Sequence, residues 1–157
     1  MNTSLPASEL TRWMGTALTE VVETLLGGSV TNSTQVPIPP TPTALVAEIA
    51  LIGATSQGAV RLILPDAFVR SAAAALLGGS EADPRSEAQL KDFGGEVANM
   101  VAGRLASELR RVGFPCTLGT PSVSRGWVAP SETIVTGEWL CQGFPLRLEF
   151  SSPLPPA

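Results

Sequence analysis

The segment that decides the fold is SEAQLKDFGGEVANMVAGRLASELRRV, residues 86–112. Apolar residues recur in it at intervals of three and four, which is the period of one helix face. They form the stripe Leu90, Phe93, Val97, Val101, Leu105, Leu109 and Val112. The pattern predicts a long amphipathic helix that lays this stripe on a hydrophobic core.

The opposite side of this helix carries polar and small residues. At roughly 100° per residue, a solvent-facing band forms from Asp92, Glu96, Asn99, Gly103 and Arg110. Glu96 and Asn99, at positions i and i+3, are neighbours on this surface. Because Gly95 and Gly103 beside them have no side chain, another protein could approach the pair closely.

The glycines of this helix permit two interpretations. A glycine inside a helix costs up to about 1 kcal/mol relative to alanine, which suggests that Gly94, Gly95 and Gly103 have a use. The alternative is that Gly94 and Gly95 only let the helix pack close to a sheet. Glu96 and Asn99 would then be ordinary solvated residues.

The rest of the chain predicts shorter elements on both sides of this helix. A first helix runs from about residue 10 to the glycines at 27–28, and a second runs from Pro65 and Asp66 to the glycines at 78–79. A β-hairpin is expected from strands 45–53 and 59–64 with a turn at 55–58. Strands are also expected at 116–123, 133–140 and 144–150, the last two joined by a turn at Gln142-Gly143.

These elements predict a single α+β domain over residues 1–157, with an antiparallel-rich sheet packed against two long helices. The third helix faces outward with its polar band. Residues 29–43, with four prolines, are expected to form an extended connection, and 153–157 a frayed tail. Leu-Leu-Gly-Gly occurs at 25–28 and at 76–79, and we interpret it as a common helix ending rather than an internal duplication.

Composition excludes several classes of function. The net charge is −4 and the sequence pI about 4.8, without a basic cluster, so a nucleic-acid partner is not expected. The longest apolar stretch, 44–54, is interrupted by Glu48 and too short to cross a bilayer, and the first residues do not resemble a signal peptide. A cytosolic protein is expected. The low charged fraction of 15% suggests apolar surface hidden in an oligomer.

Histidine is absent from the sequence, which excludes histidine-based acid–base and nucleophilic catalysis and histidine-ligated zinc. The two cysteines, Cys116 and Cys141, lie far apart without Cys-x-x-Cys spacing, so we expect two buried thiols on strands and no metal site. Any chemistry must then use carboxylates, amides, lysine or arginine.

The run 93–103, FGGEVANMVAG, resembles the signature helix of the CheC, CheX and FliY phosphatases, in which Glu-x-x-Asn is followed by Gly. The segments 50–53, 58–62 and 75–78 are similar to the hairpin and helix that precede this motif in CheX. The segment 121–126 resembles the family's Pro-x-x-x-x-Gly strand. The resemblance extends from about residue 20 to residue 126.

This resemblance implies hydrolysis of the aspartyl phosphate of a CheY-like receiver domain. Asn99 would orient the attacking water, and Glu96 would pair with a lysine of the receiver. Asp92, Gly95 and Gly103 would contact the partner. The chain would need no cofactor of its own, since Mg²⁺ would be held by the receiver's carboxylates.

One motif, where CheC-type chains carry two, favours CheX, whose members look like homodimers formed through their sheets. Glu20 and Glu23 of the first helix are not followed by asparagine, so a second site is not expected. Arg104, directly after Gly103, departs from the smaller or uncharged residue expected there and could alter the choice of partner.

Two other functions remain open at this point. The first is a binding module that docks on a phosphorylated receiver, or in a flagellar switch, without hydrolysis. The second is a hotdog-type thioesterase, which also wraps a sheet around a long helix. Thioesterases bury their catalytic groups in a cleft, whereas Glu96 and Asn99 lie opposite the apolar stripe, so this alternative is disfavoured.

Overall fold

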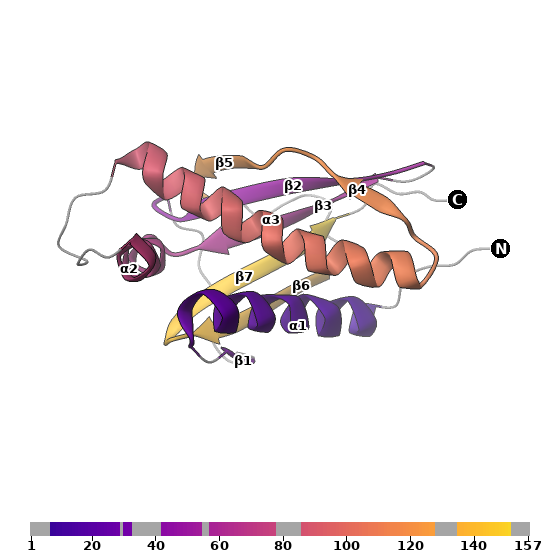
Figure 1. Ribbon diagram of the computed structural model, residues 1–157, viewed down its shortest axis with the longest axis horizontal. Helices are drawn as coiled ribbons and strands as arrows, with labels where there is room; N and C mark the ends of the chain where they lie inside the picture. The colour runs from indigo at the N-terminus through magenta and orange to yellow at the C-terminus, as the bar shows by residue number, and fades with distance from the viewer. Residues whose placement is uncertain are drawn as a thin grey trace.

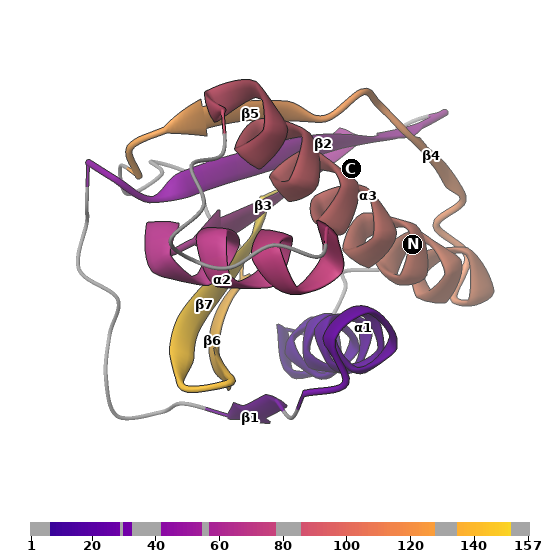
Figure 2. The same cartoon turned by 60° about the vertical axis from the view of Figure 1, so that its left-hand side comes forward.

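In the part of the chain that the structure describes, seven strands form one antiparallel sheet, and three helices cover one of its faces (Figures 1 and 2). The computed structural model describes residues 7–28, 30–32, 42–54, 57–77, 86–127 and 135–151. The sheet order is β1-β6-β7-β3-β2-β4, and β5 also pairs with β2. The strands are β1 Val30–Asn32, β2 Leu45–Gly53, β3 Gln57–Leu64, β4 Cys116–Leu118, β5 Ser122–Arg125, β6 Val135–Cys141 and β7 Phe144–Ser151. The predicted α+β class is confirmed.

The helices are α1 Ala7–Leu26, α2 Asp66–Leu77 and α3 Glu87–Arg111. Ser86 begins α3 with a capping box, in which its hydroxyl accepts the Gln89 N–H and the Gln89 side chain accepts the Ser86 N–H. Gly27 ends α1 at φ 65°, a conformation that glycine adopts without strain. The two long helices α1 and α3 lie side by side across the sheet, and α2 crosses near one end (Figure 1).

The predicted hairpins form, with one correction at the first. Gln57 and Gly58 belong to β3, where they pair with Ile52 and Leu51, so the turn is shorter than the expected 55–58. Residues 55–56 lie outside the described part. In the second hairpin, Gln142 and Gly143 have φ values of 53° and 83°, as a two-residue turn between antiparallel strands requires.

The single strand predicted at 116–123 is wrong, because two strands with a bulge between them occupy this segment. Leu118 pairs with Leu51, and Ser122 pairs with Glu48. Three residues therefore separate the paired positions on the β4–β5 side, and two separate them on β2. One extra residue on one side of a strand pair defines a bulge. The extra residue reverses the alternation of side chains, so Pro121 and Val123 face the helices.

Part of the predicted connection is a strand that the sequence did not reveal. Within 29–43, residues 30–32 form β1, an edge strand paired with β6. Residues 29 and 33–41 lie outside the described part, as does the tail predicted at 153–157. Three residues without alternating apolar character carry no strand signal, so only the pairing with β6 identifies them.

The strand order has the same pattern read from either end of the sheet. Each half of the chain contributes a helix, an edge strand and a hairpin. These are α1, β1 and β2–β3 in the first half, and α3, β4 with β5, and β6–β7 in the second. The two halves meet where β3 pairs with β7. Each edge strand pairs with the hairpin of the other half. The arrangement relates α1 to α3, whereas Leu-Leu-Gly-Gly occurs after α1 and α2. The tetrapeptide therefore does not mark equivalent positions.

The main core lies between the helices and the sheet. Five residues of the predicted α3 stripe are buried in it: Leu90, Val97, Val101, Leu105 and Leu109. Phe93 is half-buried, and Val112 is a correction, since it caps the helix and is 45% exposed. Cys141 is buried on β6 as expected, but Cys116 on β4 is only half-buried, and both thiols are free.

Candidate functional site

The outward face of α3 presents the predicted polar residues to solvent. Asp92, Glu96 and Asn99 are exposed, while Val97, Ala98 and Val101 on the other side are buried. The separation follows from helix geometry, since residues three and four apart share a face. Glu96 and Asn99 therefore lie one turn apart, with Cβ atoms about 5–6 Å from each other.

Strand β5 completes a groove beside this face. The open groove has a volume of about 570 Å³ and is lined by Lys91, Asp92, Gly95, Glu96, Asn99, Pro121 and Val123. Four of these residues belong to the predicted site: Asp92, Gly95, Glu96 and Asn99. The bulge between β4 and β5 turns the side chains of Pro121 and Val123 toward the groove. Sequence reasoning missed Lys91, Pro121 and Val123 as members of the groove.

The two adjacent glycines of α3 have different roles. A Cβ on Gly94 would lie 2.5 Å from Leu45 Cδ2, so Gly94 lets the helix pack against β2. A Cβ on Gly95 would lie 3.4 Å from Pro121 Cβ and from Val123 Cγ2, so Gly95 keeps the groove open at its base. Gly103 is half-buried near Leu118 and does not line the groove. The packing interpretation therefore holds for Gly94.

The polar side chains of the groove lack partners within the described part of the chain. Lys91, Asp92, Glu96 and Asn99 make no hydrogen bond or ion pair with the residues that the structure describes. A stripe of free donors and acceptors beside an apolar wall can bind a group on another molecule without first breaking internal bonds. The arrangement therefore favours recognition of a polar or charged partner surface.

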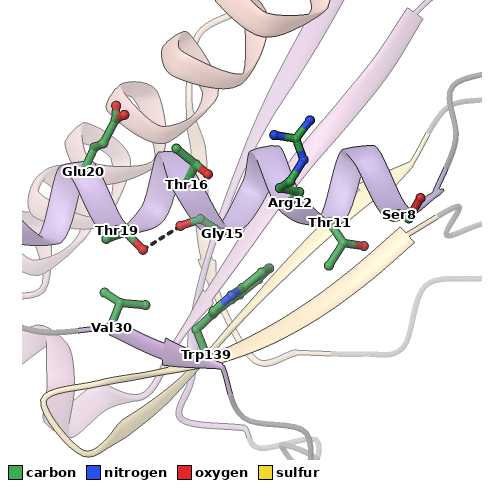
Figure 3. Close-up of a pocket in the computed structure, with 9 residues that line it drawn as sticks. All are labelled: Ser8, Thr11, Arg12, Gly15, Thr16, Thr19, Glu20, Val30 and Trp139. Atoms are coloured by element: carbon green, nitrogen blue, oxygen red, sulfur yellow. Dashed lines mark hydrogen bonds between the residues drawn. The ribbon is translucent and has the colours of Figure 1, made fainter.

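A second hollow, of about 520 Å³, is lined by residues of α1 together with Val30 and Trp139 (Figure 3). Here the polar groups are largely engaged within the protein. The Thr19 hydroxyl donates to the Gly15 carbonyl, Arg12 pairs with Glu9, and Glu20 accepts from Arg104. The hollow occupies the place on α1 that the groove occupies on α3, but its lining lacks a Glu-x-x-Asn pair. It is the weaker candidate.

Arg104 has an intramolecular partner. Its Nη1 lies 2.7 Å from Glu20 Oε2, so the ion pair joins α3 to α1. The two side chains are 40% and 50% exposed, and such a pair contributes little to stability. The arginine that departs from the family pattern thus points toward α1, and it does not line the groove.

Arg125 connects the groove's two walls, a role that sequence reasoning missed. Its guanidinium on β5 donates to the Glu87 carboxylate on α3, to Asp66 on α2 and to the Thr43 carbonyl. The hydrogen bond from Arg125 lowers the pKa of Glu87. Burial raises the pKa of Asp66, but bonds from Arg70 and Arg125 outweigh it and leave that pKa lowered. Both carboxylates raise the pKa of Arg125.

The described residues offer neither a metal-binding cluster nor a membrane-spanning helix. They contain no group of three or more cysteine, aspartate or glutamate side chains placed to hold a metal ion. None of the described helices is long and apolar enough to cross a membrane.

Comparison with known proteins identifies similar sequences and folds. The sequence pattern of the family described as "Chemotaxis phosphatase CheX" matches residues 45–144. The structure is similar to CheX from Vibrio vulnificus, at 20% identity and a TM-score of 0.78 over 95% of this chain and 99% of that one. A CheX from Desulfovibrio desulfuricans gives 20% identity and a TM-score of 0.75 over 92% and 99%.

The structure is also similar to one determined as a complex. CheX of Borrelia burgdorferi, in a CheX–CheY–BeF3–Mg²⁺ complex, gives a TM-score of 0.66 at 14% identity over 95% of this chain and 99% of that one. No curated protein sequence matches the chain.

Proposed function

The chain belongs to the CheX family of chemotaxis phosphatases, and from this premise we propose that it hydrolyses the aspartyl phosphate of a CheY-like response regulator. The observation that carries the proposal is the exposed pair Glu96 and Asn99, one turn apart and without internal partners in the described structure. The helix would insert this pair into the receiver's active site.

Asn99 is assigned the positioning of water. An acyl phosphate has a good leaving group, so catalysis needs a water held in line with the phosphorus atom and little acid–base chemistry. Water attacks phosphorus, the bond to the aspartyl oxygen breaks, and the products are the free carboxylate and inorganic phosphate. A side-chain amide can hydrogen-bond the water without adding charge.

Glu96 is assigned to anchor the inserted helix. The resemblance implies that it pairs with a lysine of the receiver, and its position one turn before Asn99 would fix the depth of the amide. A charge-assisted bond gives this anchor more strength than a neutral one. Asp92 and Gly95 line the same groove, so they would contact the partner around the anchor.

The partner's chemistry is supported by a relative. The Borrelia burgdorferi structure contains CheX, CheY, BeF3 and Mg²⁺ together. In this chain we assign any Mg²⁺ to the receiver's carboxylates, and we place the reaction in the cytosol with the receiver.

We also propose a homodimer formed through the sheets. Strands β1 and β4 lie at the two ends of the sheet order, and Ile52 at the end of β2 is 44% exposed. Edge strands and exposed apolar side chains favour association with a second copy. Light scattering that gives the mass of a dimer would support this, and a monomer at micromolar concentration would contradict it.

The proposed activity is tested by phosphate release from a panel of receivers phosphorylated with a small-molecule donor. The chain is expected to accelerate release from at least one receiver. If it binds a phosphorylated receiver and leaves the lifetime unchanged, the non-catalytic adaptor replaces the phosphatase. Hydrolysis of acyl-CoA substrates would instead indicate a thioesterase, a class disfavoured by the exposure of Glu96 and Asn99.

A further inference from the structure

Lys91 is the only lysine of the sequence, and it lines the groove that contains Glu96 and Asn99. Its side chain is half-buried, yet its ammonium has no hydrogen bond or ion pair with any described residue. Most arginines of the described part are instead held by carboxylates: Arg12, Arg61, Arg70, Arg104, Arg111, Arg125 and Arg147. The groove therefore contains an unsatisfied cation.

The carboxylate one turn before Lys91 does not satisfy this cation. Glu87 lies one turn before Lys91. The pKa of Glu87 is lowered mainly by the hydrogen bond from Arg125, and the charge of the Lys91 ammonium lowers it further. Both Glu87 oxygens already accept from Arg125, at 2.9 and 2.8 Å. The ammonium of Lys91 is left to solvent or to a partner.

We propose that Lys91 is a docking residue that donates to an acidic side chain of the phosphorylated receiver, at the rim of the inserted site. This inference rests on the proposed function and adds a specificity contact to it. Lys91 precedes Glu96 by five residues and Asn99 by eight, or about 7.5 and 12 Å along the helix axis. Because Asn99 is placed at the phosphoaspartate, the acidic group that Lys91 recognises would lie about 12 Å from the phosphoaspartate along the axis of α3.

The charge pattern of the groove determines the partner's chemistry. The α3 face carries a cation at Lys91, followed by anions at Asp92 and Glu96. A surface complementary to this strip presents a carboxylate opposite the first position and a cation opposite the anions. A charge at the rim acts mainly on the association rate and its salt dependence, since exposed pairs are screened by ions.

The test measures the dissociation constant for a receiver loaded with beryllofluoride and Mg²⁺, as a function of salt. At low salt, Lys91→Gln is expected to weaken binding about threefold and Lys91→Glu about tenfold, while Lys91→Arg stays within twofold of wild type. The differences should shrink in high salt. Arg110→Gln is the matched control, because it removes one exposed charge that has no partner among the described residues and lies about 28 Å away on the same helix.

Chemical modification tests the same charge without a substitution. Acetylation of the wild-type protein removes the ammonium charge, and reductive methylation keeps it. Only acetylation is expected to weaken binding. The Lys91→Arg variant, treated identically, corrects for the amino terminus. This comparison remains decisive even if Lys91→Gln or Lys91→Glu folds poorly.

Phosphate release separates this inference from the proposed function. If wild type accelerates release, Lys91→Glu should raise KM and leave kcat within twofold. Unchanged KM and affinity in Lys91→Glu and in acetylated protein would overturn the docking role and leave the phosphatase intact. A wild-type protein that binds without accelerating release would overturn the phosphatase alone, and the binding series would still decide the role of Lys91. A wild type that binds no receiver would overturn both.

Discussion

Arg125 Nε and Nη2 lie 2.9 and 2.8 Å from the two carboxylate oxygens of Glu87, so a residue of β5 holds the first turn of α3. The same guanidinium donates to Asp66 at 2.7 Å. Because β5 and α3 form the two walls of the groove, these bonds join the two walls at the first turn of the helix.

The Arg125 cluster predicts a specific loss of stability in acid. The pKa values of Asp66 and Glu87 are lowered in the folded protein, so the unfolded chain binds more protons as the pH falls. Their contribution is complete above the ordinary carboxyl pKa near 4 and disappears as the pH falls through the lowered values. Arg125→Met removes the bond to the part-buried Asp66, which should lower stability at pH 7 by about 1–2 kcal/mol, and it should flatten the decline of Tm below pH 4.5.

Thermal unfolding of the wild type and of Arg125→Met between pH 7 and pH 2.5 checks this prediction. The matched control is Arg12→Met, whose pair with Glu9 is exposed and distant from the groove. Parallel pH profiles for the wild type and Arg125→Met would contradict the cluster's role.

Glu149 is a buried carboxylate on the outer face of the sheet, only 1% exposed. It accepts hydrogen bonds from Arg61, Arg147 and the indole of Trp127, at 3.0, 2.8 and 3.0 Å. Glu149→Ala leaves these donors without their acceptor, so we expect a loss of about 3–5 kcal/mol in urea unfolding. Glu9→Ala, which breaks an exposed pair, should cost less than about 1 kcal/mol. Equal losses would contradict this account.

Two glycines of α3 should respond oppositely to alanine. A Cβ on Gly94 meets the buried Leu45, so Gly94→Ala is expected to lower the free energy of unfolding by about 1–3 kcal/mol. A Cβ on Gly103 would lie 3.8 Å from Leu118 Cδ1, an ordinary contact. Gly103→Ala should therefore raise the free energy of unfolding by up to about 1 kcal/mol. Urea unfolding measures both, and a stabilised Gly94→Ala would contradict the packing role.

Gly103→Ala also separates folding from partner contact. Because the variant should fold well, any loss of affinity for the receiver reports on close approach at this position, as the sequence predicts. Unchanged affinity would remove Gly103 from the partner-binding surface.

The sequence predicted α3 and its polar face because, in a helix, the spacing of residues along the chain determines which face each side chain occupies. It could not predict the groove, since that depends on a bulge whose extra residue is visible only in the pairing of β4 and β5 with β2. Strand register decides that Pro121 faces the helix, and no local pattern encodes it. Lys91 and Arg125 were overlooked for a similar reason. The bonds of Arg125 to Glu87 and Asp66, and the position of Lys91 in the groove, depend on contacts between segments that are distant in the sequence.

The two thiols should differ in reactivity. Burial raises the pKa of Cys141 to about 12, and burial also raises that of the half-buried Cys116. Because the thiolate is the reactive form, alkylation of Cys141 at pH 8 should require opening of the fold, while Cys116 reacts first. Mass spectrometry of iodoacetamide-treated protein, with and without urea, measures this order. Equal labelling in native buffer would contradict it.

The central claim is that Asn99 positions the attacking water and Glu96 anchors the helix. The most direct measurement is single-turnover phosphate release at saturating enzyme, with receiver affinity measured in parallel for wild type, Asn99→Ala and Glu96→Ala. We predict that Asn99→Ala binds within a few-fold of wild type and releases phosphate on the order of 10² times more slowly. Glu96→Ala should weaken binding. An Asn99→Ala variant that releases phosphate at the wild-type rate when saturated would contradict the account.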